Sequence, residues 1–310
     1  MPEMGPQISG SDAACSDPVS EHLVCGVVIS YKPSPEIVGN VEVLRSQMAR
    51  VVVVDNTETP DAATLGVLAS LEQIPGCTVL RNGRNLGIAA ALNIGIRHAI
   101  AEGFSWIATF DQDSRIRGGY VDAMLSAYRS AASGNIGMLC PRYEDARLGT
   151  ALPIYRDAHG DVFACMTSGA MMEAKMFERI GPMEEAFFID YVDLEYCLRM
   201  RAAGLKIMEC KSAVLTHSLG RMTQHRILGR SFSATNHSAK RRYYITRNRV
   251  VLMRRYFSTH RDWVVADLKG MAMEAVIMLL VERDRMAKIG YMMRALYDGA
   301  CNRLGPGVAL

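Results

Sequence analysis

The chain lacks two patterns that would assign it at once to a familiar class. Its eight cysteines contain no C-x-x-C pair, which disfavours a zinc or thiol redox site. Most of them lie in apolar runs, so we predict free buried thiols in a reducing compartment. No uncharged apolar stretch reaches the roughly 18 residues of a membrane-spanning helix, because Glu274 interrupts the best candidate. The sequence therefore predicts a cytoplasmic protein that does not cross a membrane.

The first residues also lack a targeting pattern. Residues 1–21 have neither the basic start nor the apolar centre of a secretory signal. Their polar, proline-containing composition predicts a disordered leader.

A third absence concerns the turn after the first predicted strand, SYKPSPE at residues 30–36, which contains two prolines and no glycine. A dinucleotide-dependent dehydrogenase needs glycines there so that the backbone can approach the pyrophosphate. Asp55 does close the second strand, where such enzymes carry a ribose-binding acid. Without the glycines, a dinucleotide-dependent dehydrogenase is disfavoured, and the phosphates of a nucleotide ligand must be bound in another way.

The 310 residues are 49% hydrophobic and 22% charged, as in ordinary globular proteins. From residue 22 to about 135, short apolar runs alternate with segments of helical spacing. We expect strands at 23–31, 50–56, 77–82 and 105–113 and helices at 35–48, 60–73 and 87–103. Strands alternating with helices in this way predict an α/β fold with a mostly parallel sheet, which binds ligands beyond the carboxyl ends of its strands.

Polar residues follow several of these strands, and ATFDQDSRI at 108–116 is the most informative segment. Asp111 and Asp113 stand two residues apart, so in a strand their carboxylates would project to the same side. Carboxylate oxygens are the ligands that Mg²⁺ and similar cations prefer. A solvated turn would also explain these acids, but their position at the predicted ligand-binding edge favours a metal site.

Several segments, taken in order, resemble family 2 glycosyltransferases of the GT-A fold. VVISY, VVVVDN, RNGRNLGIAAALNIGI and FDQDS match the nucleotide-sugar half, and FFIDYVDLEYCLRMRAAG and LTHSLG match the acceptor half. NHSAKRRYYITRN and LLVERDRMAKI are similar to bacterial rhamnosyltransferases that use dTDP-L-rhamnose, including those that add the second rhamnose in rhamnolipid synthesis. The resemblance implies a GT-A catalytic domain over 22–220, with a nucleotide-sugar half at about 22–115 and an acceptor half at about 116–220.

The resemblance also implies roles for individual residues. Asp113 and His217 would bind Mg²⁺ or Mn²⁺ across the diphosphate, although imidazole suits Mn²⁺ better than Mg²⁺. The residues expected to contact the nucleotide sugar are Ser30, Tyr31, Asp55, Asn56, Arg81, Asn85, Gly87, Asp111 and Arg247.

On the acceptor side, Asp193 aligns with the catalytic aspartate of the family, although the usual Glu-Asp pair is Val192-Asp193 here. Asp190 is expected to cap the helix that carries Asp193, and Gly204 is expected to end that helix. Ser168, Gly169 and Glu195 would border the acceptor. The acids could also merely complement the helix dipole.

The composition changes after Gly220. From Arg221 to Asp262, eleven lysines or arginines accompany one acid, which predicts a local positive field. Apolar and methionine-rich helical segments follow. We expect residues 221–310 to form a basic helical extension that contacts an anionic membrane surface, contacts another copy of the chain, or covers the sheet.

The implied activity is inverting, metal-dependent transfer of L-rhamnose from dTDP-L-rhamnose to a glycolipid acceptor such as a mono-rhamnolipid. A rhamnosyltransferase of O-antigen or other cell-surface polysaccharide assembly is the alternative. A nucleotidyltransferase would need a glycine-rich and basic first loop that SYKPSPE lacks. A nucleic-acid-binding module would explain the basic segment but not Asp193 or the D-Q-D sequence, so no nucleic-acid partner is expected.

Overall fold

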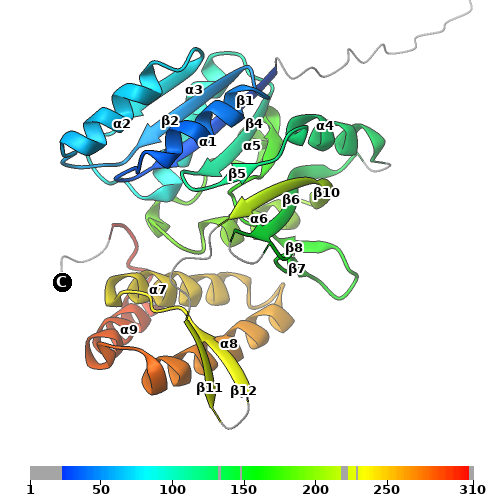
Figure 1. Cartoon of the computed structure of the whole chain (residues 1–310). Coiled ribbons are helices and arrows are strands. Elements are labelled where there is room, and N and C mark those ends of the chain that lie inside the picture. The colour runs from blue at the N-terminus through cyan, green and yellow to red at the C-terminus, as the bar shows by residue number, and fades with distance from the viewer. Residues whose placement is uncertain (1–22, 132–133, 147–148, 218–222, 228–229, 307–310) are drawn as a thin grey trace, which may run out of the picture.

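The computed structural model describes residues 23–131, 134–146, 149–217, 223–227 and 230–306. The predicted leader at 1–21 lies outside these residues. The centre of the fold is a ten-stranded mixed sheet in which β3, β2, β1, β4, β9, β6, β10, β8 and β7 follow one another and β5 pairs with β10. Helices lie against this sheet, and a helical layer made by the C-terminal part of the chain lies below it in Figure 1.

The first half confirms the predicted alternation of strands and helices. Its elements are β1 (Val24–Ser30), α1 (Glu36–Arg45), β2 (Arg50–Asp55), α2 (Ala62–Glu72), β3 (Cys77–Arg81), α3 (Ile88–Ala101) and β4 (Trp106–Asp111). The pairs β1–β2, β1–β4 and β2–β3 are parallel. Every residue of β1 is buried, which requires cover on both faces of the sheet. The carboxyl ends of these four strands therefore meet at one edge.

Close packing fixes α3 against this sheet. A Cβ added to Gly95 of α3 would lie 2.3 Å from Val27 Cγ1 on β1. A Cβ added to Gly26 would project to the opposite face of the sheet, 2.9 Å from the sulfur of Met48, which follows α1. The two neighbouring strand positions thus pack on opposite layers of helix.

The second half of the sheet mixes strand directions. Its elements are β5 (Arg115–Ile116), α4 (Tyr120–Ser130), β6 (Ile136–Asp145), β7 (Tyr155–Arg156), β8 (Val162–Ala164), β9 (Met171–Glu173), α5 (Ala174–Ile180), η2 (Glu185–Phe187), α6 (Val192–Ala202) and β10 (Lys206–His217). Strand β9 runs antiparallel between β4 and β6, and β10 is parallel to β6. The end of β10 therefore lies at the same edge as the end of β4.

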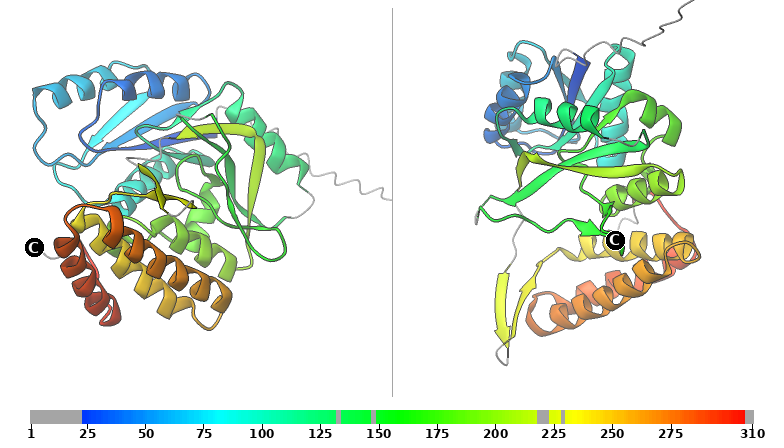
Figure 2. Two further views of the ribbon diagram at one scale, coloured as in Figure 1. Left: turned by 60° about the horizontal axis from the view of Figure 1, so that its bottom comes forward. Right: turned by 90° about the vertical axis from the view of Figure 1, so that its right-hand side faces the viewer.

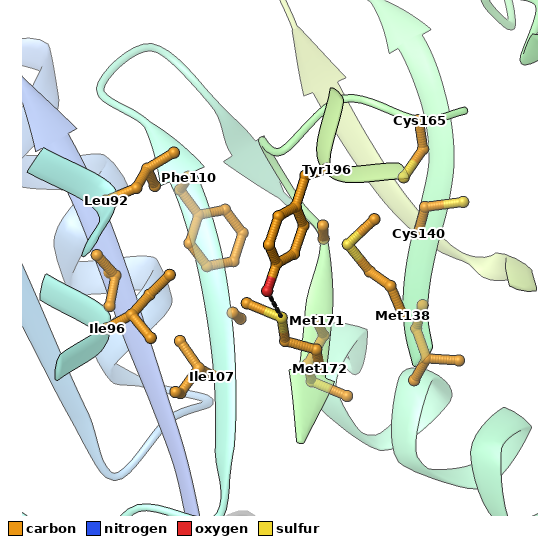
Figure 3. Close-up of a cluster of buried hydrophobic side chains, with 14 of the residues drawn as sticks. Leu92, Ile96, Ile107, Phe110, Met138, Cys140, Cys165, Met171, Met172 and Tyr196 are labelled. Carbon is orange, nitrogen blue, oxygen red and sulfur yellow. Dashed lines mark hydrogen bonds between the residues drawn. The ribbon is translucent and has the colours of Figure 1, made fainter. Parts of the chain in front are cut away.

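The core joins the two halves of the sheet. Figure 3 shows Tyr196 of α6 between Phe110 of β4 and Met138 of β6, with its hydroxyl directed at the sulfur of Met172 at 3.9 Å. Cys140 and Cys165 lie in the same region. The described cysteines are free, as predicted, and five of them are buried: Cys25, Cys140, Cys165, Cys197 and Cys210.

The C-terminal part consists of the hairpin β11 (Thr223–Ile227) and β12 (Arg230–Ala234), followed by α7 (Ala239–Tyr256), α8 (Arg261–Val281) and α9 (Arg285–Ala300). Figures 1 and 2 show the three helices as a layer apart from the sheet, with the hairpin extending from it. Helices α7 and α9 approach closely at Gly299, where an added Cβ would lie 2.8 Å from the carbonyl oxygen of Arg247. None of the described helices combines the length and apolar character needed to cross a membrane.

Part of the basic charge of this segment is paired with acids within the fold. Arg242 and Arg249 of α7 are buried and form ion pairs with acids of α8 and its end, among them Glu274 at 3.3 Å and 3.0 Å respectively. Arg242 also pairs with buried Glu282 at 2.8 Å. The acids that pair with Arg242 and Arg249 come later in the chain, so a count over residues 221–262 does not include them.

Candidate active site

Asp111, Asp113 and His217 form a cluster at the carboxyl edge of the sheet, where ligand atoms from the three side chains lie within 4.8 Å of one another. Asp113 Oδ1 is 3.8 Å from His217 Nδ1. Strand β5 brings these residues together, because after the D-Q-D turn it pairs antiparallel with the last residues of β10. Two carboxylates and an imidazole suit a divalent cation, and side-chain exposure of 51% at Asp113 leaves room for further ligands.

The local geometry differs from the one predicted. Strand β4 ends at Asp111, and residues 112–114 form a turn, so strand alternation does not align the two acids. Instead the turn is held by hydrogen bonds on both sides. Gln112 Oε1 accepts from the Tyr31 backbone nitrogen at 2.8 Å, and Asn40 donates to the carbonyl oxygen of Gln112 at 3.0 Å. The turn is thereby fixed to the end of β1 and to α1.

Ser168 supports the cluster through hydrogen bonds. It is buried, and its hydroxyl oxygen accepts from the Asp111 backbone nitrogen at 3.1 Å and lies 2.6 Å from the hydroxyl of Ser114. Ser114 Oγ is in turn 3.5 Å from His217 Nδ1. Gly169 has a φ of +80° and packs tightly against Leu215. Ser168 therefore braces Asp111 and, through Ser114, the imidazole of His217, and contact of Ser168 or Gly169 with an acceptor stays a prediction.

Burial raises the pKa of Asp111, and the neighbouring carboxylate of Asp113 raises it further, while His217 and Arg241 oppose the rise. Negative charge concentrated in a partly desolvated site favours binding of a cation, which would relieve the repulsion.

The predicted nucleotide contacts at the ends of β1 and β2 are tied to one another. Ser30 and Asp55 are buried, and Ser30 Oγ donates to Asp55 Oδ1 at 2.8 Å. Thr57 donates its backbone nitrogen and its hydroxyl to the same carboxylate at 3.2 Å and 3.0 Å. Asn56 Nδ2 donates to the carbonyl oxygen of Gly87 at 3.0 Å. These side chains shape the sheet edge, and their contact with a nucleotide stays a prediction.

The remaining predicted donor residues lie around the same edge. Tyr31 is 39% exposed. Arg81 ends β3 and pairs with Glu72 at 2.7 Å on the surface. Asn85 Oδ1 accepts from the Gly87 backbone nitrogen at 3.0 Å, and Gly87 has a φ of +86°. An added Cβ at Gly87 would lie 2.5 Å from the carbonyl oxygen of Phe188, so this glycine lets the start of α3 contact the loop before α6.

Asp193 lies in the first turn of α6, where its Oδ1 accepts from the Leu194 backbone nitrogen at 2.8 Å. Burial raises its pKa to about 6, and the charges of Asp190 and Asp111 add to the rise. A carboxylate with a pKa near the working pH is suited to general base catalysis. Asp193 lines two adjoining cavities, of ≈ 300 Å³ and ≈ 690 Å³.

The loop before α6 holds three non-glycine residues with left-handed backbone. Phe188, Asp190 and Tyr191 have φ of 66°, 61° and 65°. Each such residue costs energy and persists only when surrounding contacts enforce it. Asp190 does not cap α6 as predicted, since Tyr191 occupies the N-cap position without a side-chain hydrogen bond. Instead, the carboxylate of Asp190 accepts from Arg241 at 2.9 Å.

Two buried residues of α7 enforce this loop. Asn248 Nδ2 donates to the carbonyl oxygens of Phe187, Ile189 and Asp190 at 3.0, 2.9 and 2.9 Å. Arg247 Nη2 donates to the carbonyl oxygen of Phe187 at 3.1 Å. Asn248 and Arg241 were not among the predicted site residues, although both lie in the segment NHSAKRRYYITRN.

Two predicted site residues are placed elsewhere. The guanidinium of Arg247 is fully buried and donates to backbone carbonyls of Ala186, Phe187 and Gly305, so it does not face a diphosphate. Glu195 is also buried, and it pairs with Arg199 at 2.8 Å and with Arg255 at 3.4 Å rather than bordering an acceptor. Both predictions failed because helical position alone does not reveal which side of the helix faces the interior.

Asn248→Ala should uncouple the loop from α7. Removal of the amide leaves buried carbonyl oxygens without a donor, each costing about 1–3 kcal/mol, so we expect the free energy of unfolding to fall by at least about 2 kcal/mol. The turnover rate should fall as well, because Asp193 follows this loop directly. Chemical denaturation and steady-state kinetics measure the two effects. Asn248→Asp is the matched variant, since it keeps the shape but loses the donors; wild-type stability in both variants would contradict the role assigned to Asn248.

Known proteins share both the sequence pattern and the fold. Residues 26–179 match the model of glycosyl transferase family 2. The chain is 29% identical over 303 residues to the dTDP-rhamnosyl transferase RfbF of Shigella flexneri, covering 92% of this chain and 97% of that protein. It is 25% identical over 256 residues to the galactofuranosyltransferase GlfT1 of Mycolicibacterium smegmatis, covering 74% of this chain and 83% of that protein.

Solved structures of low sequence identity share the architecture. A mannosyltransferase from Pyrobaculum calidifontis in complex with GDP-Man and Mn²⁺ superimposes with a TM-score of 0.54 at 14% identity, covering 93% of this chain and 89% of that one. GalNAc-T7 with UDP, GalNAc and Mn²⁺ gives a TM-score of 0.57 at 13% identity, over 78% of this chain and 49% of that one. The fold is thus GT-A-like, as predicted, with a C-terminal helical region.

The acidic and histidine cluster at the strand ends, the matched segment and the named relatives agree with one another. The chain is therefore a glycosyltransferase, and its residues 26–179 match the model of glycosyl transferase family 2.

Proposed function

We propose that this glycosyltransferase moves L-rhamnose from dTDP-L-rhamnose to a hydroxyl group of a glycolipid, with a mono-rhamnolipid as the candidate acceptor. Similarity to a dTDP-rhamnosyl transferase along nearly the whole chain supports the donor. The observation that carries the chemistry is the proximity of two acidic centres with different surroundings, the Asp111, Asp113 and His217 cluster and the protonatable Asp193.

The reaction in this proposal is a single displacement. Asp193 takes the proton of the acceptor hydroxyl as its oxygen bonds to the anomeric carbon. The bond from that carbon to the diphosphate oxygen breaks, so a β-linked donor gives an α-linked rhamnoside. Asp111, Asp113 and His217 would hold Mg²⁺ or Mn²⁺, which when bound offsets the negative charge of the leaving diphosphate. Ser114, which also contacts Ser168, would orient the imidazole of His217.

Purified protein incubated with dTDP-L-rhamnose and Mg²⁺ or Mn²⁺ tests the proposal directly. Mono-rhamnolipid and a rhamnose-terminated oligosaccharide are the two acceptors, and UDP-galactofuranose serves as the competing donor. We expect mass spectrometry to show addition of one deoxyhexose and NMR to show an α-linkage. Transfer from UDP-galactofuranose alone would refute the rhamnose donor, and exclusive use of the oligosaccharide would assign the enzyme to polysaccharide assembly.

We also propose peripheral contact between α8 and an anionic membrane, supported by an apolar face that is open to solvent. Val265, Leu268, Val276 and Leu279 are 44–50% exposed and follow helical spacing. Exposed basic residues lie on this part of the chain or next to it: Lys240, Arg254, Arg261, Lys269, Arg283 and Arg285.

The protein should therefore float with anionic vesicles at low salt and be released at high salt, because each basic contact contributes roughly 1 kcal/mol near the surface. The double variant Leu268→Ser, Val276→Ser should float less, since it loses apolar contact. Leu65→Ser on α2, where the leucine is 42% exposed, is the matched control. Equal flotation of the three proteins, or none at low salt, would reject α8 as the membrane-contacting element.

A further inference from the structure

We propose that the ≈ 690 Å³ cavity beside Asp193 binds an apolar chain of the acceptor, so that the acceptor is an amphiphile whose reacting sugar carries an alkyl or similar group. This inference rests on the proposed role of Asp193 at the acceptor. Apolar side chains dominate the cavity wall, among them Leu152, Ile154, Met166, Leu194 and Trp263. The volume lies within the range of small-molecule sites in proteins.

Two carboxylates line this cavity, those of Asp193 and Asp267, and only one of them lacks an ion pair among the described residues. Asp267 also lines it, but its carboxylate pairs with Arg249 at 3.1 Å and accepts from the hydroxyl of Tyr191 at 3.4 Å. Asp193 accepts one backbone hydrogen bond and has no ion pair among the described residues. An apolar ligand in this cavity would therefore end beside a carboxylate that is free to accept a proton.

Asp193 and Leu194 also line the adjoining ≈ 300 Å³ cavity, whose other members are mostly polar. Thr235 and His237 contribute to its wall, as does the ion-paired side chain of Glu274. Hydroxyl groups of a sugar find several donors and acceptors among these side chains, whereas polar side chains are a minority in the larger cavity, among them Asp267, Tyr143 and Tyr155. A cavity rich in polar residues and a mainly apolar cavity share the same carboxylate, which matches a molecule with one polar and one apolar part.

The position of α8 adds a second observation. Trp263, Ala266 and Gly270 line the cavity and follow helical spacing on one face of α8. The exposed residues Val265 and Leu268 fall on the opposite face. Such a helix, apolar on both sides, would ordinarily be buried on both. Here one side is open and the other encloses the cavity, which favours an apolar ligand over an incidental packing defect.

Trp263 provides a direct probe that does not depend on the donor sugar. The chain contains two tryptophans, and Trp106→Phe leaves Trp263 as the only one. Titration with octyl rhamnoside below its micelle concentration should change the Trp263 emission, whereas methyl rhamnoside should have little effect. Lengthening the chain should tighten binding by about fourfold for each buried methylene. Equal binding of the methyl and octyl compounds would overturn the inference.

Gly270→Leu should narrow the cavity and weaken octyl rhamnoside binding by about tenfold or more, the equivalent of two displaced methylenes. An added Cβ at Gly270 meets no atom within 4 Å, so the helix tolerates the change. Gly66→Leu on α2 is the matched control, because this helical glycine is equally unobstructed. Ala266→Leu provides a second variant that narrows the same cavity. Unchanged octyl rhamnoside binding in both variants would reject the cavity as the binding site.

Turnover separates this inference from the proposed function. In Gly270→Leu, the KM for mono-rhamnolipid should rise at least tenfold, while the Gly66→Leu control keeps the wild-type value. Transfer to a short saccharide without alkyl binding at Trp263 would refute the amphiphilic acceptor and leave rhamnosyl transfer standing. Alkyl binding without any transfer from dTDP-L-rhamnose would refute rhamnosyl transfer and leave the apolar binding site standing.

Discussion

Asp193→Asn should lower kcat by about 10²–10⁴-fold and leave the affinity for dTDP close to that of the wild type. The amide keeps the shape of the side chain but cannot take the proton of the acceptor hydroxyl. Asp193 lies in the first turn of α6 and does not belong to the Asp111, Asp113 and His217 cluster that is the candidate cation site. Calorimetry with dTDP and a turnover assay measure the two properties separately.

The pH dependence gives the same prediction an independent readout. Since burial raises the pKa of Asp193 to about 6, the active carboxylate form is lost as the pH falls through about 6, and kcat/KM should fall with it. The residual activity of Asp193→Asn should not show this fall in kcat/KM at low pH. Wild-type turnover in the variant would remove Asp193 from the chemistry, and lost dTDP binding would place it at the donor.

Ionisation of Asp193, which activates the enzyme as the pH rises, should lower the stability of the folded protein. The pKa of Asp193 in the folded protein lies above the value of about 3.9 for an unfolded chain, so folding favours the protonated form. The cost of the ionised form is absent at pH values below about 4 and fully present above about 6. Asp193→Asn should therefore be more stable than the wild type at pH 8, with the difference shrinking toward pH 4. Thermal unfolding at both pH values tests this; a variant less stable at pH 8 would contradict the assigned cause of the pKa shift.

Asp113→Ala should reduce kcat by at least about 10²-fold, the loss typical of removing a major electrostatic contribution. Asp113 is the most exposed member of its cluster and lies 3.8 Å from His217, so its removal opens the proposed cation site. Excess chelator should reproduce the loss in the wild type, and Mg²⁺ or Mn²⁺ should restore it. His217→Ala should act in the same direction, because it removes another candidate ligand.

Asp122→Ala provides the matched control for Asp113→Ala, because Asp122 is an exposed acid on α4 outside the cluster. Its kcat should stay at the wild-type level. Full activity of Asp113→Ala, or of the wild type in excess chelator, would show that the diphosphate leaves without help from a cation at this site.

Much of the donor half could be read from local patterns. Valine-rich runs such as residues 51–54 are buried on both faces of a parallel sheet, and short runs separated by helical segments leave little choice of connection. The position of Asp111 at a strand end followed directly from this pattern. Strand β4 proved shorter than predicted, so the position of Asp113 depends on a turn that alternation could not describe.

The acceptor side was less predictable, because its decisive contacts join distant segments. Asn248 supports a loop about sixty residues earlier in the chain, through carbonyl oxygens that carry no side-chain signal. Arg247 and Glu195 look from the sequence like exposed charged residues, yet both are buried with partners from other elements. Helical spacing gives the face on which a residue lies but not what packs against that face.

The sequence by itself determined the alternation of strands and helices, the polar strand ends and the candidate acids, because these depend on neighbours within a few residues. Only the tertiary structure decided which of them meet. It placed His217 beside Asp113 through the pairing of β5 with β10, neutralised Arg242 and Arg249 with acids of α8, and enclosed an apolar cavity next to Asp193. These features arise from the packing of elements far apart in the chain, which local periodicity does not encode.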